Sequence, residues 1–89
     1  MASGQVGAEL GQLKALKKSF DANAQKSVDL MSSVRGQLES TWWKGPAADR
    51  FRQSWKGEFE PALKKLDAAL KEAGTEVQRR HDALQAAGG

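Results

Sequence analysis

The chain has 89 residues, of which 39% are hydrophobic and 28% are charged, with a formal net charge of +3 and no cysteine. This length bounds it to one small domain, and the absence of cysteine excludes a disulfide scaffold, a thiolate zinc site and a cysteine nucleophile. The modest positive charge permits contact with an acidic surface but does not argue for a nucleic-acid binder. Alanine and leucine dominate the apolar residues, which favours helices over a sheet.

The N-terminal segment does not look like a targeting sequence. Its first nine residues have neither the basic start nor the apolar core of a secretory signal. No apolar run in the chain approaches the roughly 18 residues that a membrane span needs. We therefore expect no cleaved signal peptide and no membrane span.

Residues 9–42 form the first periodic stretch and predict a long amphipathic helix. At about 100° per residue, their apolar side chains fall within an arc of roughly 160°, and most charged side chains lie on the other side. Trp42 lies at the edge of this arc, which favours a place in a core or a dimer interface.

The segment Trp43-Lys44-Gly45-Pro46 predicts a tight turn over residues 43–46. Pro46 cannot donate a hydrogen bond to a preceding turn and suits the first position of a new helix. Gly45 tolerates almost any backbone conformation that the reversal requires. Trp43 is expected to close this end of the hairpin, to contribute to a recognition surface, or to do both.

Residues 47–86 predict a second amphipathic helix, whose apolar arc is roughly 120° wide. Phe51, Trp55 and Phe59 recur every four residues on one face, a spacing typical of a core stripe. Gly57 and Pro61 lie inside this stretch. They predict a kink rather than a third helix, because the apolar stripe continues through them in phase.

The expected fold is all-α: an antiparallel helix-turn-helix hairpin forming one domain over residues 1–89 and dimerising into a four-helix bundle of coiled-coil type. Dimerisation is expected because the two apolar stripes are too broad for one hairpin to cover, and large exposed apolar patches mark interaction sites. The predicted core of the hairpin or the dimer is Leu13, Phe20, Met31, Val34, Leu38, Trp42, Phe51, Trp55, Phe59, Leu66, Leu70 and Val77.

The sequence offers no residues for catalysis. It contains no set of nucleophile, base and orienting residue and no glycine-rich loop between a strand and a helix. His81 is the single histidine, which excludes any site that needs two imidazoles. We expect it to be solvated or packed at the edge of the second stripe. We expect no enzyme activity, no metal site and no cofactor.

The tripeptide Trp43-Lys44-Gly45, in the middle of a short chain with a predicted helix on each side, resembles the WXG family of ESAT-like helical hairpins. Type VII secretion systems export these proteins. The downstream spacing agrees, since Ala47-Ala48, Phe51 and Trp55 follow on the first turns of the second helix. The resemblance covers nearly the whole chain and singles out Trp43, Lys44 and Gly45 as the secretion-motif turn.

This resemblance implies a non-enzymatic secretion substrate or targeting partner that acts as a folded dimer with itself or with a WXG paralogue. It also implies synthesis in the cytoplasm, recognition by the membrane ATPase of the type VII system, and secretion without a cleaved signal peptide. The second interpretation keeps the fold and makes the chain a chaperone or adaptor that escorts a larger toxin or effector to the secretion machine. A nucleic-acid-binding hairpin is a third, less favoured interpretation, because Lys, Asp and Glu are mixed on the helix faces.

One departure concerns the C-terminal part of the export signal. Many actinobacterial members carry Tyr-x-x-x-Asp/Glu after the second helix, and this chain has no tyrosine. The family pattern puts Val77 at the tyrosine position and His81 at the acidic position, with Asp82 one residue late. The signal is then supplied by a partner or takes another form, and the sequence leaves open a homodimer or a heterodimer.

Overall fold

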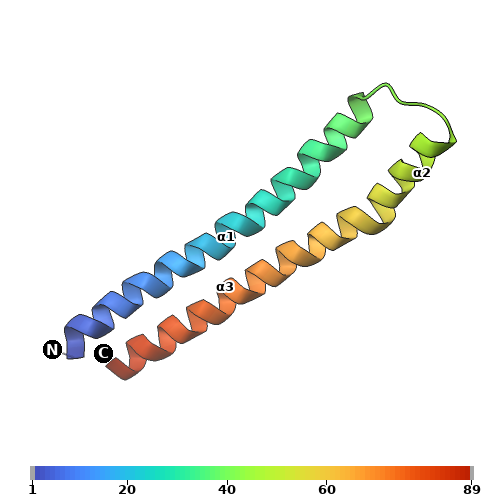
Figure 1. The fold of residues 1–89 in the computed structure, drawn as a ribbon. Helices are drawn as coiled ribbons and strands as arrows, with labels where there is room; N and C mark the ends of the chain where they lie inside the picture. Colours follow the sequence, from blue (N-terminus) through green and yellow to red (C-terminus); the bar gives the residue numbers. More distant parts are fainter. Residues whose placement is uncertain (1, 89) are drawn as a thin grey trace.

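The computed structural model describes residues 2–88, with side chains from residue 5 onward. Helix α1 spans Ala2–Ser40, residues 41–45 reverse the chain, and the second arm is helical from there to its end. This second arm consists of α2 (Pro46–Ser54), the π-helical segment η1 (Trp55–Phe59) and α3 (Glu60–Gly88). The two arms lie side by side and antiparallel, with both chain ends opposite the turn (Figure 1). The prediction of an all-α hairpin is confirmed.

The molecule is a rod one helix pair thick, with extents of 68 × 18 × 11 Å. Its helical bounds differ slightly from the expected ones. Helix α1 begins before residue 9 and stops at Ser40, so that Trp42 lies in the turn rather than on a helix. The second arm begins at Pro46, which occupies the first helical turn as its fixed backbone angle favours.

A π turn occupies the place where the sequence predicted a kink. The Glu60 N–H donates to the Trp55 carbonyl, five residues back instead of four. Pro61 explains this geometry, because its ring would crowd the Gly57 carbonyl in a regular helix and it has no N–H to offer. The wider turn accommodates the proline, and the helix continues through it.

The line of contact between the arms consists mainly of small and polar residues. On the second arm, Glu60, Gly74 and His81 are buried and Asp67 is half-buried. These four positions recur every seven residues, the spacing of a coiled-coil seam. On α1, the buried residues are Ala24, Ser27 and Met31.

Gly74 marks a close approach of the two arms. A Cβ atom at this position would lie 3.0 Å from Asp21 Oδ1 and 3.4 Å from Phe20 Cβ. A side chain at this position would therefore require its neighbours, the tip of Asp21 first, to shift by a few tenths of an ångström. The close approach favours glycine here through space rather than through its backbone angles.

Candidate functional site

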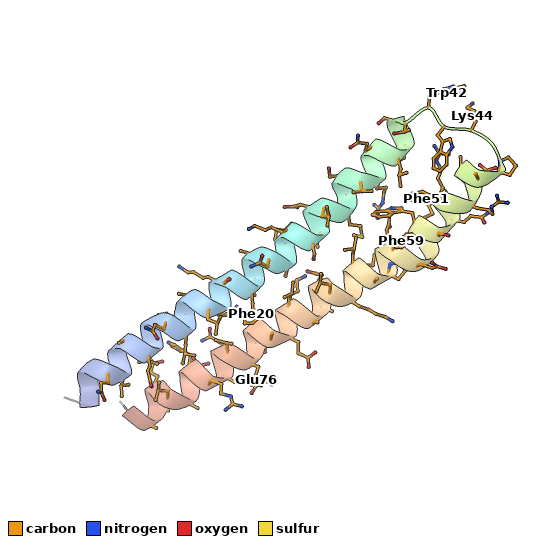
Figure 2. All side chains as sticks on the ribbon, viewed as in Figure 1. Phe20, Trp42, Lys44, Phe51, Phe59 and Glu76 are labelled. Carbon is orange, nitrogen blue, oxygen red and sulfur yellow. The ribbon has the colours of Figure 1, made fainter. Side chains whose placement is uncertain are left out.

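The turn between the arms presents two tryptophans. Trp42 is 86% exposed and Trp43 is 39% exposed. Figure 2 shows Trp42 and Lys44 at the tip of the hairpin, away from the line of contact between the arms. Exposed tryptophans are costly to hydrate and are enriched at protein interfaces, so this tip is the candidate recognition surface.

Gly45 gives the turn its shape. Its φ of 115° and ψ of 176° lie in a region that residues with a Cβ rarely adopt. The Gly45 carbonyl then accepts a 3.0 Å hydrogen bond from the Asp49 N–H and so begins α2. The third residue of the Trp-Lys-Gly tripeptide is thus fixed by backbone conformation, since no atom lies within 4 Å of where its Cβ would be.

An aromatic row runs from the turn along the second arm. The rings of Trp43 and Phe51 are 5.7 Å apart, those of Phe51 and Phe59 are 6.3 Å apart, and those of Trp55 and Phe59 are 6.2 Å apart. Distances of this size are typical of tilted aromatic pairs. Trp43 is therefore packed on its own chain, whereas Trp42 is not.

One side of the hairpin is markedly apolar. A hollow of about 330 Å³ between the arms is lined only by Leu30, Val34, Trp55, Phe59, Ala62 and Leu63. Leu16 lies two heptads before Leu30, and Leu66 lies one heptad after Phe59, so both extend the same side along the rod. We call this surface the apolar side, defined as Leu16, Leu30, Val34, Phe59, Leu63 and Leu66.

The apolar side stays open in a single hairpin because the line of contact lies at its edge. Four of its members remain between 45% and 53% exposed: Leu16, Leu30, Phe59 and Leu66. A fully packed core would cover such residues almost completely. The contact between the two arms therefore covers only the edge of the apolar side, and the centre of this surface stays accessible to solvent.

The twelve residues predicted for the hairpin or dimer core divide into three groups. Met31 is buried in the hairpin itself. Seven others are half-buried: Leu13, Phe20, Val34, Leu38, Trp55, Leu70 and Val77. The remaining four are exposed in a single chain: Trp42, Phe51, Phe59 and Leu66.

A bidentate ion pair crosses the hairpin beside the π turn. Arg35 Nη2 lies 2.7 Å from Glu60 Oε1, and Arg35 Nε lies 3.0 Å from Glu60 Oε2. The Glu60 side chain is only 8% exposed. The hydrogen-bonded Arg35 guanidinium holds the pKa of the Glu60 carboxyl below its ordinary value, against the opposing effect of burial.

Three residues that the sequence analysis did not place in the core or the turn are prominent in the structure. Arg52 reaches back from α2 to the end of α1 and donates to backbone carbonyls there. Glu60 is buried, and His81 is 4% exposed, so of the two expected settings for the histidine the packed one is found and the solvated one is wrong. Glu60, Asp67, Gly74 and His81 recur every seven residues, and this spacing was the signal that could have found Glu60 and His81.

Other chemistry finds little support in the described residues. Within residues 2–88, no three His, Asp or Glu side chains are grouped closely enough to hold a metal ion. No helix of this part of the chain is both long and apolar enough to cross a bilayer. Comparison with protein-family models, with curated proteins and with solved structures finds no match to this chain.

Proposed function

We propose that this chain is a non-enzymatic substrate or targeting partner of a type VII secretion system, and that it acts as a folded helical dimer. The observation that carries the proposal is the turn. A long helical hairpin reverses at Trp43-Lys44-Gly45, and Gly45 occupies a backbone conformation that suits glycine. This agrees with the resemblance to the WXG hairpins in motif, chain length and position.

The exposed tip supports a role in recognition. Trp42 and Trp43 leave apolar area in water in the turn, which lies at the end of the hairpin opposite the chain ends (Figure 1). A receptor that covers these rings would gain the hydrophobic and aromatic contacts that dominate protein interfaces. The membrane ATPase of the secretion machine is the receptor that we propose.

The surface area supports a dimer. The chain exposes 6588 Å², whereas a compact monomer of 9.6 kDa would expose roughly 5,100 Å². The excess of roughly 1,500 Å² exceeds the surface of about 800 Å² that each partner buries in a standard interface. A second hairpin, from the same chain or from a paralogue, would cover the apolar side and complete a four-helix bundle.

The test of this function is export of Trp43→Ala beside the wild type, with Lys44→Ala as the matched control in the same turn. We expect Trp43→Ala to fold and to accumulate inside the cell, while Lys44→Ala reaches the medium at the wild-type level. Circular dichroism and sedimentation check that both variants fold and pair. Wild-type export of a folded, paired Trp43→Ala variant would contradict the proposal.

A second measurement separates secretion from escort of a larger protein. If the chain is an adaptor, it should purify under native conditions in a stoichiometric complex with one large polypeptide, and that polypeptide should fail to leave the cell when this chain is absent. Export of this chain alone, with no change in other secreted proteins, fits the substrate role.

A further inference from the structure

The end of α1 lacks a basic residue of its own. No Lys or Arg lies in the last turn of this helix, although its final carbonyls have no N–H partner within the helix and carry partial negative charge. The hydroxyls of Ser40 and Thr41 donate to the Gln37 carbonyl. The carbonyls that follow need donors from elsewhere.

Arg52 supplies those donors from the opposite arm. Its Nη1 lies 2.8 Å from the Trp43 carbonyl, and its Nη2 lies 3.3 Å from the Thr41 carbonyl and 3.4 Å from the Leu38 carbonyl. One guanidinium therefore joins the last turn of α1 to both sides of Trp42. The planar, five-donor group can reach several acceptors at once, which a lysine ammonium on a flexible stem cannot do in the same geometry.

The neighbouring Phe51 holds the same turn by another contact. Its ring packs at 5.7 Å from the Trp43 ring, while Arg52 binds the Trp43 backbone. The turn is thus attached to α2 through one side chain and one main-chain group of the same tryptophan. Trp42 lies between Thr41 and Trp43, whose carbonyls are two of the three that Arg52 binds, so the direction of its side chain depends on how firmly that backbone is held.

We infer that Arg52 is a positioning residue, which caps α1 across the hairpin and holds residues 41–45 in the conformation that presents Trp42. Its role in presentation rests on the function proposed above, whereas its hold on the turn does not. Arg50 provides a matched control, because it lies two residues away on the same helix, is exposed, and makes no hydrogen bond to another side chain or to the turn within the described residues.

The test uses the full chain with Arg52→Lys, Arg52→Gln and Arg50→Lys, and measures backbone ¹⁵N relaxation. We expect the order parameters of residues 41–45 to fall from near 0.85, typical of a rigid backbone, to below about 0.6 in both Arg52 variants. Those of the helical arms before the last turn of α1 and beyond α2 should not change, because the hydrogen bonds of the guanidinium go to the turn and to the end of α1. Arg50→Lys should match the wild type throughout.

The lysine variant keeps the charge and removes the fork of donors, so it separates positioning from simple attraction to the helix end. Unchanged order in residues 41–45 of Arg52→Lys would overturn the inference, whatever export does. If residues 41–45 become mobile in Arg52→Lys and export falls, both parts of the inference are supported: Arg52 fixes the turn, and the fixed turn presents Trp42. Normal export of the mobile variant, when Trp43→Ala is not exported, would overturn the presentation role and leave the secretion function standing.

Discussion

Gly45 illustrates how a single residue sets the direction of the chain. Its φ of 115° is the one positive value in the described backbone, and it lies where α1 has ended and α2 has not begun. Any residue with a Cβ would carry strain in this conformation, even though the space around it is open. The cost of substitution here is conformational and independent of packing.

We expect Gly45→Ala to lower the free energy of unfolding by about 1–3 kcal/mol. The matched control is Gly36→Ala within α1, near its C-terminal end, where the glycine is exposed and nothing lies within 4 Å of a Cβ. That change should instead stabilise the protein by roughly 0.5–1 kcal/mol, because alanine favours a helix interior. Urea denaturation measures both, and an equal effect of the two substitutions would contradict the assigned turn.

The contribution of Glu60 to the free energy of unfolding depends on pH. In the folded hairpin, the ion pair with Arg35 lowers the pKa of its carboxyl below the ordinary value of 4.5. The folded state therefore binds a proton at Glu60 less readily than the unfolded chain. The stabilisation is complete above the unfolded pKa, and it is lost as the pH falls through the lower folded-state value.

Thermal denaturation between pH 7 and pH 2 tests this dependence. Glu60→Gln should melt below the wild type at neutral pH, because the amide cannot replace the charged acceptor of Arg35. The difference should shrink as the pH falls from 4.5 towards the lower folded-state pKa, because the unfolded chain takes up the proton first and the folded carboxyl takes it up only at the lower value. Glu58→Gln, at an exposed position without an ion pair among the described residues, should follow the wild type. A constant gap at every pH would contradict the role of Glu60.

At the scale of the helices, apolar periodicity was sufficient to predict two long amphipathic arms. Pro46 and Gly45 were sufficient to place the reversal between them. Periodicity alone could not show where the contact line falls within each stripe. That line follows the buried Glu60, Gly74 and His81 rather than Phe59 and Leu66, because two helices approach most closely over small residues and over polar groups that find partners.

The turn could be predicted only in part for a related reason. The tripeptide was evident in the sequence, but the contacts of Arg52 with carbonyls in the turn and at the end of α1 join residues that are 9 to 14 positions apart. No local pattern distinguishes Arg52 from the exposed Arg50. The π turn was likewise visible only as a disturbance at Gly57 and Pro61, since a proline within a helix can be met by a kink or by an added residue.

At the scale of the whole molecule, the rod is too thin to bury its own apolar residues. Leu66 is 47% exposed in a single hairpin, so truncating it in a monomer removes only part of the buried surface that an enclosed leucine would lose. In a dimer that covers the apolar side, the same leucine would be enclosed. The decrease in the free energy of unfolding caused by Leu66→Ala should therefore be larger when a partner covers the apolar side than when the hairpin is alone.

We expect the wild type to sediment as a dimer at micromolar concentration and to melt at a temperature that rises with concentration. Leu66→Ala should cost about 2–5 kcal/mol in the dimer, the usual range for a buried leucine, and should shift sedimentation toward a monomer. Lys64→Ala, two residues away, should change neither. A single 9.6 kDa species with a cooperative transition at every concentration would contradict a homodimer. Mixing with a paralogue would then test a heterodimer.

The π turn makes the orientation of the tip depend on the number of residues in the second arm. The wide turn takes up one residue more than a regular turn, because its hydrogen bond runs five residues back instead of four. In Pro61→Ala, which removes the steric need for the wide turn, the same residues can wind as a regular α-helix. Each residue of an α-helix turns the chain by about 100°, so Phe51 and everything before it would rotate by about that angle around the axis of the second arm. The helical content should stay unchanged by far-ultraviolet circular dichroism, while the Phe51 ring should leave Phe59 and the near-ultraviolet signal of the tryptophans should weaken. Deleting Gly57 in the same variant should restore the original phase and the near-ultraviolet signal. A single proline would thus set the direction of the tip while both arms stay helical.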